Sequence, residues 1–211
     1  MRDVRRTWEM SKEIAKGLLK IQAVFLRPNE PFTWASGIKS PIYCDNRLIL
    51  TDPEVRNTVE NEMARVVKEK YPECEKLMGT STAGIAHAAI AAHILDMPMG
   101  YVRGSAKTHG RNNRIEGKLE KGDKVVVIED LISTGGSSIE VVEALREAGA
   151  DVLGVISIFT YNTKKADEKF AEANVEKYSL CSVETMIDTA VEEGYIQADE
   201  GEGIISWLRE I

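Results

Sequence analysis

Apolar residues follow two alternating patterns along the chain. Short apolar runs predict buried strands that begin at Lys76, Met97, Val125 and Asp151, with a shorter one around Val175–Leu180. Segments with helical spacing lie between these runs. Strands that alternate with helices are typical of an α/β fold, in which an open, mainly parallel central sheet carries helices on both faces. We expect this fold here.

The predicted helices have recognisable ends. The first is expected to end before Pro28, because apolar residues recur at helical spacing up to that point: Ile14, Leu18, Ile21 and Phe25. The second begins after a cap at Thr51 or Asp52, with Pro53 in its first turn. Further helices are expected over an Ala-rich segment ending near residue 95, after a loop at 133–138, and at 164–173, 183–193 and 203–209.

Two segments have no regular pattern. Residues 31–47, PFTWASGIKSPIYCDNR, are divided by Pro31, Gly37 and Pro41 into short extended pieces and turns. Residues 104–121 are polar with little periodicity. We therefore expect an N-terminal part, 1–50, that consists of a helix and a small hood. The core, 51–211, would carry a flexible basic lid at 104–119.

Composition narrows the class of protein. The chain has 211 residues and a net charge of −7, which argues against generic nucleic-acid binding. No apolar run approaches the length of a membrane span, so no membrane partner is expected. The three cysteines, Cys44, Cys74 and Cys181, are widely spaced and have no metal or redox spacing. They predict reduced thiols in a cytoplasmic protein.

The stretch VVVIEDLISTGGSS, from Val125 to Ser138, carries the candidate chemistry. A buried strand ends in two acids, Glu129 and Asp130, and a loop of hydroxyl and glycine residues leads into a helix. Ligands of open α/β sheets bind beyond the carboxyl ends of the strands. There the loop's N–H groups can bind a phosphate, while the acids can accept hydrogen bonds from sugar hydroxyls. The stretch therefore predicts a sugar-phosphate site.

Simpler interpretations compete with this one. The loop has no Walker lysine and no dinucleotide-binding G-x-G-x-x-G pattern. A glycine-rich turn is often only a tight connection, and acids near a helix start are often only favourable to its dipole. His87 and His93 lie six residues apart on the Ala-rich helix, on different faces, and are expected to be structural or exposed.

The same stretch resembles the phosphoribosyl-pyrophosphate (PRPP) motif of type I phosphoribosyltransferases. The resemblance implies that Glu129 and Asp130 contact the ribose hydroxyls and that the loop from Thr134 to Ser138 holds the 5′-phosphate. The complete PRPP-binding set that it implies in this stretch is Glu129, Asp130, Leu131, Ile132, Ser133, Thr134, Gly135, Gly136 and Ser137.

Further segments resemble orotate phosphoribosyltransferases in particular. The pattern R-x-x-x-K-x-H-G, with Arg103, Lys107 and His109, is similar to their catalytic loop. FTWASGIKSPIYCDNR resembles their base-side segment, and GTSTAGI their pyrophosphate-side loop. From Arg103 to Lys124 the chain carries seven basic residues and three acids, as expected of a lid over pyrophosphate. The resemblance implies orotate contacts from Ser133, Lys39 and Tyr43.

The implied reaction converts orotate and PRPP to orotidine 5′-monophosphate and pyrophosphate, a step of pyrimidine (UMP) biosynthesis. Asp130, Lys107 and His109 are the candidate catalytic residues, the last two at the leaving group. The implied cofactor is Mg²⁺, carried mainly by PRPP with no direct protein ligand. The resemblance also implies a homodimer in which the lid of one subunit acts on the site of the other.

The chain departs from the family pattern at three positions where many or some members carry a cation: Gly104, Ala83 and Asn162. These departures put more weight on Arg103, Lys107 and Lys39. Two alternatives stay open. A purine-type phosphoribosyltransferase would share the PRPP loop but not R-x-x-x-K-x-H-G. A PRPP-sensing regulator would need a basic DNA-binding domain, for which the 30 residues before Pro31 leave no room.

Overall fold

The computed structural model describes residues 2–33, 39–104 and 114–210, with only the backbone described for residues 2–4. Within this part of the chain, the largest sheet has six strands in the order β10-β9-β8-β5-β6-β7. All neighbours are parallel except β6 and β7, which are antiparallel. The strands are β5 (Lys76–Thr80), β6 (Met99–Val102), β7 (Ile115–Glu116), β8 (Lys124–Ile132), β9 (Asp151–Thr160) and β10 (Lys177–Ser182).

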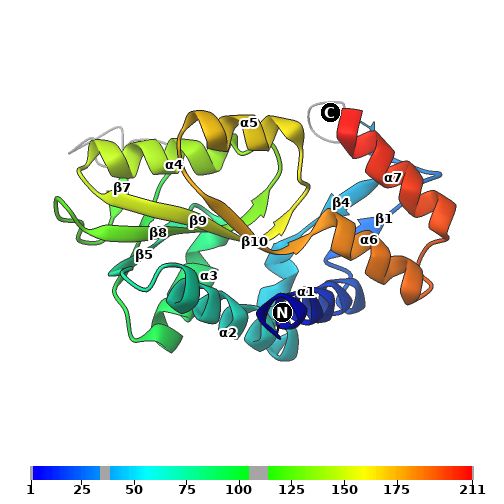
Figure 1. Cartoon of the computed structure of the whole chain (residues 1–211), viewed down its shortest axis with the longest axis horizontal. Coiled ribbons are helices and arrows are strands. Elements are labelled where there is room, and N and C mark those ends of the chain that lie inside the picture. The colour runs from blue at the N-terminus through cyan, green and yellow to red at the C-terminus, as the bar shows by residue number, and fades with distance from the viewer. Residues whose placement is uncertain (1, 34–38, 105–113, 211) are drawn as a thin grey trace.

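Helices cover both faces of this sheet, as Figure 1 shows. One face carries α1 (Arg2–Lys20), α2 (Pro53–Lys70) and α3 (Ala83–Leu95), and the other carries α4 (Gly136–Glu147) and α5 (Lys164–Glu172). Each face has its own core, because successive strand residues point to opposite sides. In β8, Val126 and Ile128 pack in the first core and Val125 and Val127 in the second. The predicted fold class is confirmed.

The N-terminal hood consists of two small antiparallel sheets. β1 (Val24–Leu26) pairs with β4 (Ile42–Cys44), and β2 (Phe32–Thr33) pairs with β3 (Lys39–Ser40). A 3₁₀ helix, η1 (Asn46–Thr51), leads into α2, which Asp52 caps by accepting hydrogen bonds from two N–H groups of its first turn. Beyond β10, α6 (Val183–Glu192) and α7 (Ala198–Glu210) lie next to the hood in Figure 1.

The first predicted helix is too long. α1 ends at Lys20, and Phe25 belongs to strand β1. Gln22 has a positive φ of 57°, and the N–H of Ala23 donates to the carbonyl of Leu18, so the chain turns out of the helix there.

Three other boundaries also differ from the sequence prediction. α7 begins at Ala198, five residues before the predicted start, and β10 extends from Lys177 to Ser182. The polar segment 104–121 was expected to lack secondary structure, but its described end contains β7. There Ile115 is buried and pairs with Val102. No helix in the described part of the chain is both long and apolar enough to span a membrane.

Candidate active site

Four strands of the large sheet end side by side, and polar loops follow them. β5 ends at Thr80, β8 at Ile132 and β9 at Thr160, and all three run parallel, so their carboxyl ends share one edge of the sheet. β6 ends there too and leads to Arg103. The hood is joined to this edge through buried Asn46, whose side-chain amide donates to the backbone carbonyl of Asp130 over 2.7 Å.

Glu129 lies beneath this edge rather than on its surface. Its side chain is buried, although it was expected to face a ligand. One carboxylate oxygen accepts from the Thr80 hydroxyl at 2.6 Å and from the Asp130 N–H at 3.0 Å. The other oxygen accepts from the Ser138 hydroxyl at 2.9 Å. Glu129 therefore joins the pyrophosphate-side loop, the acid pair and the start of α4.

The environment of Glu129 also changes its acidity. Burial, and after it the hydrogen bond and charge of Asp130, raise the pKa of the Glu129 carboxyl from its ordinary value of 4.5 to about 7. The hydroxyls of Thr80 and Ser138 act in the opposite direction. Asp130 itself is only half-buried, so its carboxylate is the more accessible member of the pair.

The loop after β8 has the geometry of an anion site. Gly135 has a φ of +74°, and a Cβ at this position would lie 3.0 Å from the Phe170 ring, so α5 packs directly on the loop. The hydroxyl of Thr163 donates to the carbonyl of Ser133 over 2.7 Å and fixes the loop's start. The N–H groups in the first turn of any helix have no intrahelical partners, and in α4 no side chain caps them, so they can bind a phosphate.

A cavity of about 640 Å³ lies between the hood and the end of β8. The structure brings Ser133 and Tyr43 together there, as expected of two orotate contacts. The cavity is lined by Phe25, Arg27, Phe32, Thr33, Tyr43, Cys44, Leu131, Ser133 and Tyr161. It therefore joins the candidate phosphate loop directly, through Ser133.

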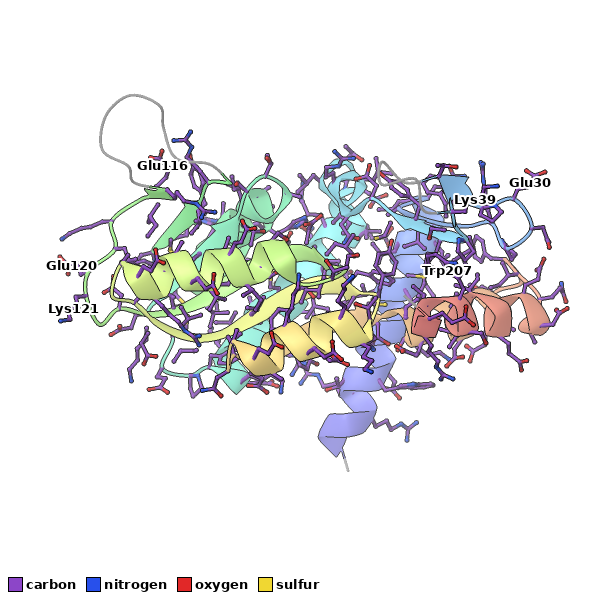
Figure 2. All side chains as sticks on the ribbon, turned by 90° about the horizontal axis from the view of Figure 1, so that it is seen from above. Glu30, Lys39, Glu116, Glu120, Lys121 and Trp207 are labelled. Atoms are coloured by element: carbon purple, nitrogen blue, oxygen red, sulfur yellow. The ribbon has the colours of Figure 1, made fainter. Side chains whose placement is uncertain are left out.

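Lys39 lies elsewhere. It lines a separate cavity of about 370 Å³ together with Trp207 of α7. In Figure 2, Lys39 lies on the hood, at the opposite end of the molecule from Glu116 of β7. Its predicted contact with orotate has no support from this geometry. Arg27, by contrast, was not predicted and does line the cavity with Ser133.

The cations of the predicted lid are only partly described. Arg103 follows β6, and its guanidinium lies 3.7 Å from the Glu116 carboxylate. Its backbone N–H donates to the carbonyl of Arg114 over 2.8 Å, which joins the two ends of the loop. Lys107 and His109 lie outside the described residues, so their predicted roles remain predictions.

No group of three or more His, Cys, Asp or Glu side chains in the described ranges could hold a metal ion. The two acids at the strand end offer one buried, fully hydrogen-bonded carboxylate and one half-buried carboxylate. Such a donor set is too small for a protein cage, but it fits a Mg²⁺ ion bound mainly by the oxygens of a phosphorylated substrate.

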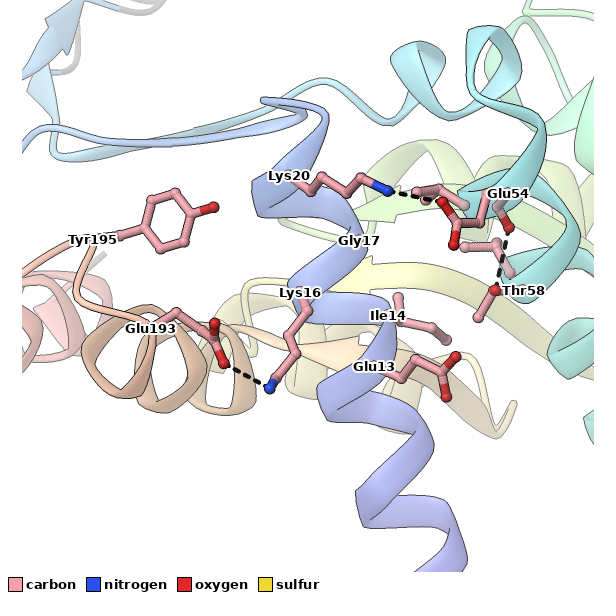
Figure 3. Close-up of a pocket in the computed structure, with 11 residues that line it drawn as sticks. Glu13, Ile14, Lys16, Gly17, Lys20, Glu54, Thr58, Glu193 and Tyr195 are labelled. Atoms are coloured by element: carbon pink, nitrogen blue, oxygen red, sulfur yellow. Dashed lines mark hydrogen bonds and ion pairs between the residues drawn. The ribbon is translucent and has the colours of Figure 1, made fainter.

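Other polar clusters lie away from the strand ends. Figure 3 shows a cavity of about 300 Å³ beside α1, in which Lys16 pairs with Glu193 at 2.6 Å and Lys20 pairs with Glu54 at 2.8 Å. His87 is buried and bonded to Glu60, whereas His93 is exposed, so the structural or exposed roles expected of these two residues are confirmed.

Known proteins resemble this chain along most of its length. Residues 57–194 match the phosphoribosyl transferase domain family. The chain is 58% identical to the orotate phosphoribosyltransferase of Bacillus subtilis (strain 168) over 196 residues, which are 93% of this chain and 91% of the relative. It is 56% identical to that of Bacillus anthracis over 200 residues, which are 95% of each chain.

Solved structures of related proteins are also similar to this chain. An orotate phosphoribosyltransferase from Aeropyrum pernix is similar with a TM-score of 0.75 at 30% identity, over 87% of this chain and 99% of that one. The UMP synthase of Leishmania donovani is similar with a TM-score of 0.81 at 27% identity, over 94% of this chain and 42% of that one. The sequence motifs, the fold and these relatives agree, and this chain belongs to the orotate phosphoribosyltransferase family.

Proposed function

We propose that this protein transfers the 5-phosphoribosyl group of PRPP to orotate and releases pyrophosphate. The observation that carries the proposal is that three features suited to three parts of the substrate lie next to one another at one edge of the sheet. The uncapped start of α4 suits the 5′-phosphate, Asp130 suits the ribose, and the cavity beside Ser133 suits a planar base. The product, orotidine 5′-monophosphate, would enter pyrimidine (UMP) biosynthesis.

The two acids would have different roles. Asp130, half-buried at the strand end, would accept hydrogen bonds from the ribose hydroxyls and orient the sugar. Glu129 already accepts hydrogen bonds from Thr80 and Ser138. It would therefore contact the ribose only by exchanging one of these hydroxyls for a sugar hydroxyl. These two hydrogen bonds join the end of β5 to the start of α4.

The reaction is a displacement at the anomeric carbon. A ring nitrogen of orotate loses its proton and forms the new bond to C1′, while the bond from C1′ to the pyrophosphate oxygen breaks and its electron pair leaves with pyrophosphate, which can take up the proton. Positive charge develops on the ribose and negative charge on the leaving group. Arg103, Lys107 and His109 would neutralise the leaving group as the lid closes. Mg²⁺ held by PRPP would supply further positive charge there.

We propose that two copies assemble as a homodimer in which the lid of each completes the site of the other. The outer face of α3 supports this proposal. The helix Ala83–Leu95 has no Lys, Arg, Asp or Glu, and Ile94 on its surface is 40% exposed. An exposed face without charges is typical of a surface that another subunit covers.

The three cysteines are free thiols, which supports the predicted cytoplasmic location.

The test measures the release of pyrophosphate from PRPP in the presence of Mg²⁺, in parallel assays with orotate, uracil, adenine and hypoxanthine. We expect rapid release with orotate and far slower release with the other three bases. A preference for adenine or hypoxanthine would make this a purine-type enzyme. PRPP binding without release from any of the four bases would favour a PRPP sensor instead.

A further inference from the structure

Arg27 lies at the cavity that the proposed function assigns to the base. It follows strand β1 in the hood, and its backbone N–H donates to the carbonyl of Pro41 over 2.8 Å, which fixes the chain at this point. Its guanidinium carbon lies 4.7 Å from the centre of the Phe32 ring. Stacking on an aromatic face orients a guanidinium without using its N–H donors. Arg27 is therefore held at the cavity with donors free for a ligand.

Arg27 has no ion-pair partner among the described residues, so its charge is available to a ligand. Among the described residues that line the cavity, Arg27 is the only one with a charged side chain. It forms no ion pair with any residue in the described ranges, whereas Arg47 of the same hood region pairs with Asp45 at 2.6 Å. Burial also raises the pKa of the Cys44 thiol and of the Tyr161 hydroxyl, so these two lining groups stay neutral.

Orotate differs from uracil by one carboxylate on the ring. Selectivity between the two therefore needs a group in the base cavity that binds an anion. Lys39, the cation expected to contact orotate, lines the other cavity with Trp207. At Ala83, Gly104 and Asn162, where some relatives were expected to carry cations, this chain has uncharged residues. Arg27 is the charged group that the fold brings to Ser133 and Tyr43.

We infer that Arg27 binds the carboxylate of orotate and so selects orotate over uncharged pyrimidines. The inference rests on the proposed function and adds the residue that recognises the negative charge of the substrate. A guanidinium presents two parallel N–H donors that match a carboxylate, and such charge-assisted pairs are among the stronger hydrogen bonds in proteins. The side chain of Arg27 is exposed, so its N–H donors are accessible to an entering base.

The experiment compares Arg27→Gln and Arg27→Lys with wild type in two readouts. The first is kcat/KM for orotate and for uracil at saturating PRPP. The second is the affinity for orotidine 5′-monophosphate and for uridine 5′-monophosphate by calorimetry, which needs no turnover. Arg5→Gln, which removes the same charge from an exposed site on α1, is the matched control. Lys39→Ala tests the rival cation.

For Arg27→Gln we expect kcat/KM for orotate to fall about ten- to a hundredfold, the loss typical of one hydrogen bond to a charged group. The value for uracil should stay within about twofold, because no contact to uracil is lost. Affinity for orotidine 5′-monophosphate should fall toward that for uridine 5′-monophosphate. Arg27→Lys should recover part of the loss, because an ammonium keeps the charge but not the paired donors.

Equal losses for both bases and both nucleotides would overturn the inference, since Arg27 would then only support the cavity wall. A loss of orotate selectivity in Lys39→Ala but not in Arg27→Gln would also overturn it. Failure of the proposed function would look different: wild type itself would neither turn over orotate nor prefer orotidine 5′-monophosphate. If Arg27→Gln folds poorly, the two nucleotide affinities of Arg27→Lys decide the question.

Discussion

At the scale of single residues, Glu129 is a buried acid whose hydrogen bonds come from several parts of the site. It is buried among apolar strand residues, and it accepts three hydrogen bonds from two loops and its own neighbour. Burial favours the protonated form and raises the pKa to about 7. Near neutral pH the group therefore carries a proton for part of the time. The free energy of unfolding therefore depends on whether Glu129 is protonated.

This linkage predicts how stability varies with pH. Below pH 4.5 Glu129 is protonated in both folded and unfolded chains. Between pH 4.5 and about 7 the unfolded chain releases the proton and the folded chain retains it, so stability falls as pH rises through this window. Relative to Glu129→Gln, which stays neutral, wild type should lose roughly 3 kcal/mol across the window. Urea unfolding of both proteins at steps from pH 4 to 8 measures this. Parallel stability curves would contradict the pKa assignment.

Ser133 provides a second residue-scale prediction. It lines the base cavity, and its carbonyl is fixed by Thr163. Ser133→Ala removes only the hydroxyl, so the orotate KM should rise about three- to tenfold, the effect of one neutral hydrogen bond, with a smaller change in the PRPP KM. Steady-state kinetics with each substrate varied would measure both. A rise confined to PRPP would assign the hydroxyl to the phosphate site instead.

The site residues that the local pattern alone predicts lie in one short stretch, whereas Tyr43, Arg103, Lys107 and His109 were expected from the family resemblance. Glu129, Asp130 and the following loop could be predicted because a strand, its end and a helix start are consecutive in the chain. The burial of Glu129 could not, because its partner Thr80 is 49 positions away. Arg27 was missed for the same reason. A lone arginine after an apolar run gives no local signal, and only the folded hood brings it to Ser133.

At the scale of elements, the site depends on how α5 packs against the loop before α4. Gly135 is in the left-handed region, and a Cβ there would be in tight contact with the Phe170 ring of α5, at 3.0 Å. The loop's shape is therefore set by tertiary packing as well as by its glycines. The lysine Nζ of Lys169, also on α5, lies 3.1 Å from where a Cβ of Gly136 would be. The same helix thus carries a positive charge to the candidate phosphate site.

Substitution at Gly135 tests this packing. Gly135→Ala should lower the free energy of unfolding by about 1–3 kcal/mol and raise the PRPP KM, because the new Cβ meets the Phe170 ring and favours negative φ. Gly203→Ala on α7 is the control, since nothing lies within 4 Å of its Cβ position. It should stabilise by about 0.5–1 kcal/mol as a helix-interior change and leave the PRPP KM unchanged. Equal effects of the two variants on stability and PRPP KM would argue against a packed phosphate loop.

Element boundaries mark the limit of local prediction. The apolar period through Ile21 and Phe25 favoured a longer first helix. The chain instead pairs Phe25 with Tyr43 in the hood, and that partner lies 18 residues downstream. The last helix was expected to begin at Gly203, but α7 begins at Ala198 and includes Gly201. Gly201 in fact allows a close approach, because a Cβ there would lie 2.8 Å from the Ile187 side chain. In both cases a tertiary contact outweighs the local pattern.

At the scale of the whole molecule, the alternation of strands and helices was enough to predict the fold class. Parallel strands need helical crossovers, and buried parallel strands appear as continuous apolar runs, so this architecture is visible in the sequence. Subunit assembly is harder to predict from the sequence pattern than the fold class. A surface that meets a second copy has no periodic signature, and the charge-free face of α3 became apparent only once its exposed side was known.

Subunit mixing tests the shared site. In a dimer with the lid acting in trans, one site of a mixed Lys107→Ala and Asp130→Asn dimer carries both lesions and the other carries neither. Two inactive proteins mixed equally should recover about a quarter of wild-type activity per site, by the symmetry of an isologous dimer. A fluorescence-transfer measurement on labelled subunits would verify that exchange has occurred. No recovery after demonstrated exchange would mean that each lid serves its own subunit.

We expect one ligand to contact the loop before α4, Asp130 and the hood cavity at the same time. A crystal structure with orotidine 5′-monophosphate would show whether it does. We expect the phosphate within about 3 Å of the backbone nitrogens of residues 134–137, the ribose hydroxyls on Asp130, and the base beside Ser133 and Tyr43 with its carboxylate on Arg27. A phosphate bound away from that loop, or a base in the Lys39 cavity, would contradict the account.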